Sequence, residues 1–554
     1  MLKWIVALDR LLRGEQTRSR SLLSGAALLL PVAGAVGSVG LMLRAGQRNE
    51  SRILLALFAI WVLSPFVALV LATLISKRWS VFTRATLHGV MLILTVGSLA
   101  IYGNMVSAPP GSKLAVPFLF VPLGSWLLIM TVTPMAALLS RRLSRFRPVR
   151  WLIKAVAGVV MLCVLGMTVL LGLLLLDHNR DTTLPTPTGA FAVGRTTSTW
   201  SDASHADRLA PQPGTKRELF AWIWYPAAPP QPSQTVDDYM PAPWRKAMEG
   251  GVLLTLLTRD LSRVHAHSIR DADVSPQQES YPVVLMRTGG AAPTTDYTSL
   301  AEDLASHGYV VVGFDAPYRS WVVVLPDGRV IARAPQNNMD LVGGPQADQL
   351  ANKLVQAWTA DTGFALDQLE RLNRSDPSGR FLGRLDMQRV GVFGHSLGGA
   401  TALLFCHDDS RCKAGIDVDG APLGNVIAEG VTQPFMFLLS DQRGESDSDA
   451  NQPESIRHAG ANIHSIYDRL PSDRRLMIMI RGAGHYMFSD DGAMLKSPLV
   501  MRVLRSSGIV PLDGRRQVAV TAHYVSTFFD IYLTGAPASQ LSIQSEYPEI
   551  EYVH

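Results

Sequence analysis

The first third of the chain contains five long apolar stretches in close succession. They cover Leu22–Leu43, Ile53–Ile75, Leu87–Met105, Leu114–Leu139 and Leu152–Leu176. Each is about as long as a helix needs to cross the hydrocarbon core of a bilayer, and none contains Asp, Glu or Arg. Soluble cores rarely contain five such stretches in a row. We therefore predict an α-helical transmembrane region over residues 22–176.

Charge is divided unevenly between this region and the rest of the chain. Residues 1–176 hold 18 Lys and Arg against three acidic residues, whereas the remainder holds 33 basic and 43 acidic residues. The net charge of +5 therefore comes from short loops between apolar stretches. This pattern is typical of a membrane protein and argues against a nucleic-acid partner.

The orientation follows from the basic residues in those loops, which number 13 on the side of the N-terminus and 6 on the other side. Because loops rich in Lys and Arg stay in the cytoplasm, we expect residues 1–21 to be cytoplasmic. Five spans then place everything after Asp177 outside the cytoplasm, on the periplasmic side of an inner membrane. Cleavage of the first span as a signal peptide near Ala33-Gly34-Ala35 would leave four spans, and the second part of the chain would still lie outside the cytoplasm. The stretch of about twenty residues before the first apolar run is long for the n-region of a signal peptide, so we expect an uncleaved span.

The second part of the chain alternates short apolar runs with helical patterns. We expect a linker over residues 177–215, a catalytic domain over 216–540 and a tail over 541–554. Continuous apolar runs predict strands buried on both faces of a mainly parallel, doubly wound sheet. These runs are Phe220–Tyr225, Pro282–Met286, Tyr309–Phe314, Arg389–Phe393, Ala414–Val418, Pro434–Leu439 and Leu476–Ile480. Helices are expected over Gln349–Asn373 and Gly399–Cys406, and a hairpin over Trp321–Arg333.

One Gly-x-Ser-x-Gly pattern, Gly394–Gly398, stands between a predicted strand and a predicted helix. In this context glycines on both sides of Ser396 allow a tight turn that exposes its hydroxyl, so Ser396 is a candidate nucleophile. A serine hydroxyl needs an adjacent base. His485 follows the last predicted strand and has the expected position in the chain order. The acid stays open between Asp419 and Asp441, which both end strands, with Asp417 deeper in its run.

The motifs of this part resemble the plasma and type II intracellular group of platelet-activating factor acetylhydrolases, an α/β-hydrolase family. The similarity covers residues 186–535 and includes PTGAFAVGRTT, DLASHGYVVVGFD, GRLDMQRVGVFGHSLGGATA, CKAGIDVDGAPLG and RGAGHYMFSD. The resemblance implies that Asp419, 23 residues after Ser396, is the acid and that Asp441 is the second choice. It also implies that the enzyme uses no metal or other cofactor.

The oxyanion hole departs from the family pattern. Members usually have a His-Gly pair after the strand that supplies it, whereas this chain has Thr288 in place of the histidine, followed by Gly289 and Gly290. We assign the backbone N–H groups of Leu397 and Gly290 as the oxyanion donors, and the choice between Gly290 and Gly289 stays open.

Two of the three cysteines lie close together in the sequence. Cys406 and Cys412 flank the turn between the Ser396 helix and the next strand, whereas Cys163 lies inside a predicted span. An oxidising compartment would allow Cys406 and Cys412 to form a disulfide, and two free packing thiols are the alternative.

These observations predict a membrane-anchored serine esterase with a Ser-His-Asp mechanism. The resemblance implies a phospholipid substrate with a short or oxidised acyl chain. A polyester or general small-ester hydrolase on the same fold is one alternative, because a fold does not fix a substrate. The other is a non-catalytic membrane sensing or binding module on a hydrolase scaffold. The sequence predicts neither the oligomeric state nor the reason for five spans.

Overall fold

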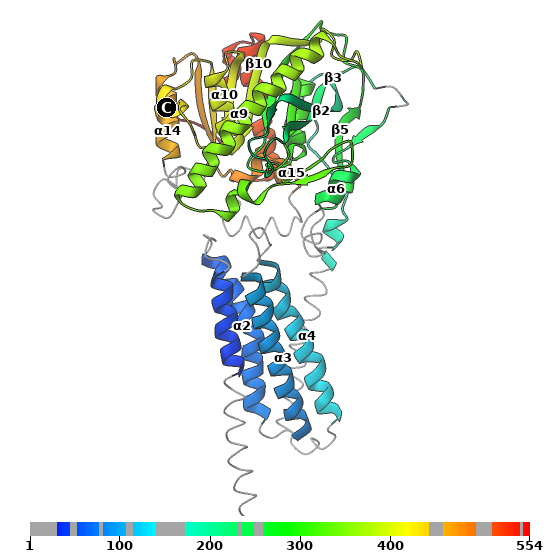
Figure 1. Cartoon of the computed structure of the whole chain (residues 1–554), viewed down its shortest axis with the longest axis vertical. Helices are drawn as coiled ribbons and strands as arrows, with labels where there is room; N and C mark the ends of the chain where they lie inside the picture. Colours follow the sequence, from blue (N-terminus) through cyan, green and yellow to red (C-terminus); the bar gives the residue numbers. More distant parts are fainter. Residues whose placement is uncertain are drawn as a thin grey trace, which may run out of the picture. The chain divides into compact units, whose positions relative to one another are not determined.

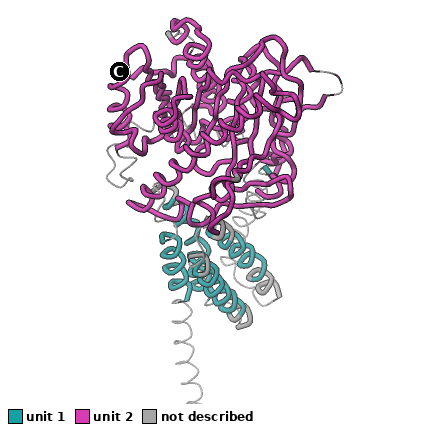
Figure 2. Tube along the Cα trace, turned by 45° about the horizontal axis from the view of Figure 1, so that its top comes forward, with its two compact units in different colours: residues 1–173 teal, residues 174–554 magenta. Residues whose placement is uncertain are grey.

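The structure is a computed structural model that describes residues 30–44, 52–76, 81–106, 115–139, 172–173, 175–230, 232, 234–248, 259–441, 458–494, 512–542 and 547–553. The chain divides into two compact units, residues 1–173 and residues 174–554, which are coloured separately in Figure 2. The first unit contains helices, and the second is built around a twelve-stranded sheet.

The helices of the first unit are α2 (Arg52–Ile75), α3 (Val81–Val106) and α4 (Ala115–Leu139), preceded by an apolar helix over Leu30–Arg44. Among the described residues, one helix is long and apolar enough to cross a membrane, Thr86–Gly103 within α3. Leu30–Arg44, Phe58–Leu74 and Val121–Val132 form shorter apolar helices. Most of the predicted fifth span, 152–176, and the start of the first lie outside the described residues. The five-span region is therefore not established by the structure and stays a prediction.

Six parallel strands form the centre of the sheet in the second unit. Their spatial order is β7 (Val310–Asp315), β6 (Tyr281–Arg287), β10 (Leu385–His395), β11 (Cys412–Val418), β12 (Phe435–Ser440) and β13 (Arg475–Ile480). The antiparallel strand β3 (Lys216–Ala227) pairs with β7. Each of the seven predicted apolar runs thus lies within a strand, except that Tyr309 and Pro434 stand one residue before β7 and β12.

Most strand pairings in the sheet are parallel, as predicted, and antiparallel pairings with β3, β4 (Val236–Asp238) and β14 (Ile550–Tyr552) make the sheet mixed. Beyond β3 lie β2 (Ala192–Ala206), β5 (Val264–Arg270), β1 (Thr182–Thr183) and β4, and β14 pairs antiparallel with β13. The predicted linker 177–215 and tail 541–554 are therefore wrong, since both contribute strands to the sheet. The hairpin prediction is confirmed by β8 (Val322–Val324) and β9 (Val330–Ala332).

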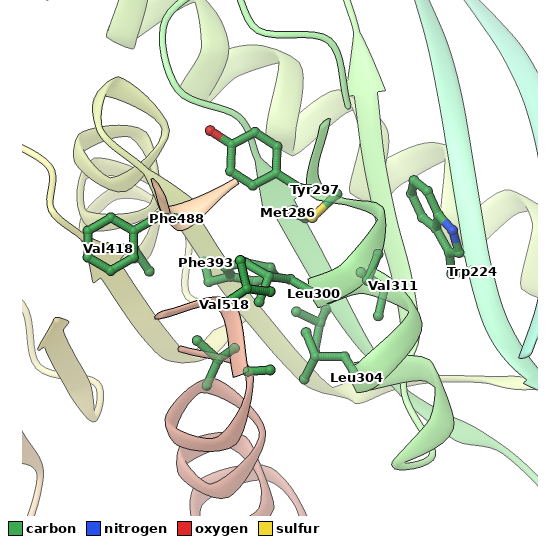
Figure 3. Close-up of a cluster of buried hydrophobic side chains, with 14 of the residues drawn as sticks. Trp224, Met286, Tyr297, Leu300, Leu304, Val311, Phe393, Val418, Phe488 and Val518 are labelled. Carbon is green, nitrogen blue, oxygen red and sulfur yellow. The ribbon is translucent and has the colours of Figure 1, made fainter. Parts of the chain in front are cut away.

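Helices cover both faces of the sheet (Figure 1). Alternate residues of β6 explain why: Val284 and Met286 pack into one apolar cluster, and Val283 and Leu285 into another. The first cluster includes side chains of α8 (Thr298–Ser306) and α17 (Gly514–Phe529), as Figure 3 shows for Leu300, Leu304 and Val518. The second includes α9 (Pro345–Arg374), α10 (Leu397–Asp408) and α14 (Ala459–Arg469).

Candidate active site

Ser396 lies in the sharp turn between β10 and α10. Its backbone has φ 58° and ψ −123°, a conformation that L-residues rarely adopt and that persists only where the surroundings impose it. The flanking glycines make the turn possible: a Cβ on Gly394 would lie 2.2 Å from the carbonyl oxygen of Gly398. A Cβ on Gly398 would lie 2.4 Å from the carbonyl oxygen of Arg287. The turn therefore has the geometry of a nucleophile elbow.

The ends of four neighbouring parallel strands bring the candidate residues together. Ser396 follows β10, Asp419 follows β11, Ser440 ends β12, and His485 begins the short helix η6 (His485–Phe488) after β13. Backbone bonds hold the register, because the Ser396 N–H donates to Val418 and the Asp419 N–H donates to Leu438. The site thus occupies the carboxyl edge of the sheet, where open α/β sheets place their ligand sites.

The side chains of Ser396, His485 and Asp419 form a continuous hydrogen-bonded series. His485 Nε2 lies 3.1 Å from Ser396 Oγ, and His485 Nδ1 lies 2.6 Å from Asp419 Oδ2. Asp419 is 2% exposed, and it also accepts bonds from the N–H and the hydroxyl of Ser440. A buried carboxylate held in this way can orient the imidazole and stabilise its protonated form, while Nε2 can take the serine proton.

The other two acids have different neighbours. Asp441 Oδ2 accepts a bond from the N–H of Gly482, so it supports the loop that carries His485 rather than the imidazole itself. Asp417 is fully buried, and its Oδ1 accepts a bond from the N–H of Gly420. Of the three acids that the sequence left open, the structure places Asp419 against His485.

The two candidate oxyanion donors flank Ser396. Leu397 is the first residue of α10, where a backbone N–H has no partner within the helix. The loop after β6 approaches from the other side, since a Cβ on Gly289 would lie 3.2 Å from Ser396 Cβ. The N–H of Gly289 donates to the hydroxyl of Tyr297, whereas no described residue accepts from the N–H of Gly290, which has φ 49°. Gly290 is therefore the better donor for a bound ester.

Several groups next to the site were missed by the sequence analysis. Tyr297 hydrogen-bonds to His395 as well as to Gly289, and the His395 ring lies against that of His485. Asp490 begins helix α15 (Asp490–Met494), five residues after His485, and accepts a bond from the Ser299 N–H. Burial raises the pKa of Asp490 to about 8. These contacts join segments that are far apart in the sequence, so no local sequence pattern predicts them.

The structure joins Cys406 and Cys412 by a disulfide that connects the last turn of α10 to the start of β11. Both residues are buried, at 0% and 1% exposure. Cys163 lies outside the described residues. Within the described part of the chain, no group of three or more His, Cys, Asp or Glu side chains could hold a metal ion.

Comparison with known proteins identifies a family and several relatives. The family model for platelet-activating factor acetylhydrolase, isoform II, matches residues 177–336 and 349–532. A probable 1-alkyl-2-acetylglycerophosphocholine esterase of Arthroderma benhamiae is 24% identical over 67% of this chain and 93% of its own length. The platelet-activating factor acetylhydrolase of Canis lupus familiaris is 26% identical over 38% of this chain and 49% of its own length.

A solved structure, the ferulic acid esterase from Streptomyces cinnamoneus, is also similar. It is 27% identical with a TM-score of 0.53, and the match covers 68% of this chain and all of that one. Fold and relatives together define the class: the chain is a carboxylic ester hydrolase with the α/β-hydrolase fold. Within that class, it belongs to the platelet-activating factor acetylhydrolase isoform II family.

Proposed function

We propose that the chain hydrolyses esters through Ser396, His485 and Asp419. The observation that carries this proposal is the hydrogen-bonded series of these three side chains at the ends of adjacent strands, with Ser396 held at φ 58°. His485 Nε2 takes the proton of Ser396 Oγ, which attacks the ester carbonyl. Asp419 stabilises the imidazolium that results.

The negative charge that develops on the carbonyl oxygen would be held by the N–H groups of Leu397 and Gly290. Each such donor typically contributes about 10²–10³ to the rate. His485 then gives its proton to the departing alcohol. A water molecule that His485 deprotonates attacks the acyl-enzyme, which releases the acid and restores Ser396.

For the substrate we propose a phospholipid with a short or oxidised acyl chain. Support comes from the fungal and canine relatives, whose names give an alkyl-acetylglycerophosphocholine ester and platelet-activating factor as substrates. The ferulic acid esterase favours the second candidate, a small ester without a lipid, because that enzyme is matched over its full length.

We further propose that the first unit anchors the catalytic unit in a membrane through five spans. The N-terminus would lie in the cytoplasm and the catalytic unit on the periplasmic side. Support comes from the division of charge along the chain and from large aliphatic side chains that are more than half exposed on α2 and α3, such as Ile60 and Ile93. Exposed apolar surface of this kind marks a membrane or protein contact.

The test is a panel of esters of increasing acyl length, presented to the full-length protein in detergent. Ser396→Ala should lower turnover of the best ester by about 10⁴-fold or more and abolish labelling by a fluorophosphonate. Ser378→Ala, which alters an exposed serine in a turn, is the matched control and should keep full activity. Undiminished turnover in Ser396→Ala would refute the serine mechanism. A wild-type protein that neither hydrolyses nor labels would support the sensing module.

A further inference from the structure

Tyr297 connects the oxyanion loop to the strand of the nucleophile. It ends the short helix η3 (Thr294–Tyr297), and its ring packs in the first apolar cluster at 2% exposure. Figure 3 shows its hydroxyl directed away from the aliphatic side chains of α8. That hydroxyl lies 3.1 Å from the backbone nitrogen of Gly289 and 2.7 Å from Nδ1 of His395.

The direction of these two bonds follows from the chemistry of the groups. A backbone N–H can only donate, so the Tyr297 oxygen accepts from Gly289. Burial raises the pKa of Tyr297, so the hydroxyl keeps its proton at neutral pH. In the described part of the chain, His395 Nδ1 is the acceptor within reach of that proton.

The two hydrogen bonds of Tyr297 connect it to residues next to the reacting groups: Gly289 beside the proposed oxyanion donor, and His395 beside the nucleophile. Gly289 immediately precedes Gly290, the proposed oxyanion donor, and it lies close to Ser396, since a Cβ added to Gly289 would lie 3.2 Å from Ser396 Cβ. His395 immediately precedes Ser396, and its ring centroid lies 4.6 Å from that of His485. One hydroxyl therefore links the oxyanion loop, the nucleophile and the surroundings of the base.

We infer that Tyr297, acting through His395, is a positioning residue that fixes the Gly290 N–H relative to Ser396. The inference rests on the proposed serine mechanism. Gly290 has a positive φ and no side chain, and a Cβ there would meet no atom within 4 Å, so this residue makes no side-chain packing contact. The carbonyl groups on either side are held by the N–H groups of Ala292 and Trp321, and the bond from the Gly289 N–H to Tyr297 adds a restraint on the amide side. Because a displacement of about 1 Å can cost roughly 10²-fold in rate, the restraint matters for turnover.

The simpler explanation is that Tyr297 only fills space in the apolar cluster. The two explanations differ in what the hydroxyl does, and Tyr297→Phe separates them because the ring remains. A space-filling role predicts unchanged kinetics. The positioning role predicts that kcat falls about tenfold to a hundredfold with KM nearly unchanged, because the oxyanion donor acts on the transition state rather than on the bound ester.

His395 offers a matched pair of substitutions. In His395→Asn the amide oxygen occupies nearly the place of Nδ1 and still accepts from Tyr297, whereas the similarly sized His395→Leu cannot. We expect kcat of His395→Asn to lie within about threefold of wild type and that of His395→Leu to fall about as far as in Tyr297→Phe. The double variant Tyr297→Phe/His395→Leu should be no slower than the slower single variant, because both remove the same linkage.

These kinetics are measured on the full-length protein with p-nitrophenyl acetate, beside Ser396→Ala and with thermal unfolding of each variant. Equal kcat in wild type and Tyr297→Phe, equal kcat in the Asn and Leu variants, or additive losses in the double variant would each overturn the inference. Those outcomes leave the serine mechanism intact as long as Ser396→Ala is inactive. Activity in Ser396→Ala would instead refute the proposed function.

Discussion

The two units of the chain both bury apolar clusters, but they differ in the apolar side chains that they leave exposed. In the catalytic unit the large apolar side chains fill the two clusters beside the sheet, and few are more than half exposed. In the first unit Ile60 and Ile93 are exposed by 65% and 64%, while the hydroxyl-bearing Thr73 and Ser98 are buried. Thr73 satisfies its hydroxyl within its own helix by donating to Leu69.

This difference is what the proposed anchoring of the first unit in a membrane would produce. Water drives apolar surface inward, as in the catalytic unit. Hydrocarbon does not, so helices in a bilayer can expose aliphatic side chains and bury small polar ones between them. The comparison supports the proposed anchor through side-chain placement, a kind of observation independent of hydropathy.

The largest expected effect tests the polar site of the catalytic unit. Asp419→Asn should lower kcat by about 10⁴, because the amide no longer orients His485 or stabilises its charged form. Asp441→Asn retains an acceptor for Gly482 and should lower kcat less than tenfold. Steady-state hydrolysis of a soluble ester measures both. Equal losses of kcat in the two variants would mean that the hydrogen bond between Asp419 and His485 has no special role in catalysis.

That contrast also shows how far the sequence could lead. Ser396 and His485 were predictable because each follows an apolar strand in the expected order. The acid was not fixed by the residues themselves, since Asp417, Asp419 and Asp441 lie near the ends of two adjacent strands. Their side-chain directions depend on local backbone, including φ 55° at Asp419. The family resemblance favoured Asp419, and the structure brings that residue to His485.

The missed strands have a common physical cause. In β2 the exposed face carries Thr197 and Thr199. In β14 a single residue, Ile550, is buried, and it packs in the first apolar cluster. Such strands, which are short or partly exposed, lack the continuous apolar run of a strand buried on both faces, so periodicity alone assigned them to a linker and a tail. Tyr297 was missed for another reason: its partner His395 lies 98 residues away.

The next effect tests the environment of the first unit. Ile93→Arg places a charge on the exposed side of α3, and in a bilayer it should disfavour insertion by about 3 kcal/mol. Val330→Arg makes the same change at a 57% exposed site of the catalytic unit, where about 0.5 kcal/mol or less is expected. Carbonate-resistant membrane association and thermal unfolding measure the two effects. If Ile93→Arg changed membrane association as little as Val330→Arg changes stability, the contrast between the units would be removed.

A smaller effect tests the compartment of the catalytic unit. Cys406→Ser/Cys412→Ser removes the disulfide and should lower the free energy of unfolding by about 2 kcal/mol, as expected for a short closed loop. Alkylation of the native protein with and without prior reduction, followed by mass spectrometry, shows whether the pair is oxidised. Free thiols in protein isolated under non-reducing conditions would argue for a reducing, cytoplasmic site.

The last effect is a change of slope with pH and concerns how the catalytic unit tolerates a buried acid. Asp490 is 1% exposed, and burial raises its pKa from 3.8 to about 8. Between those values the folded protein binds a proton that the unfolded chain has lost, so the stability contributed by protonated Asp490 is present below about pH 4 and is lost as pH rises toward 8. The slope is at most about 1.4 kcal/mol per pH unit, the limit for one proton.

Asp490→Asn keeps an oxygen for the Ser299 N–H and removes the titration, so its unfolding free energy should depend less on pH across this window. Asp473→Asn, at an exposed position before β13, is the control and should keep the wild-type slope. Urea unfolding from pH 5 to pH 8 measures all three proteins. If Asp490→Asn and wild type share one slope, Asp490 is ionised in the folded protein. A charged carboxylate would then lie at a position that is 1% exposed, where burial is expected to raise the pKa of the acid.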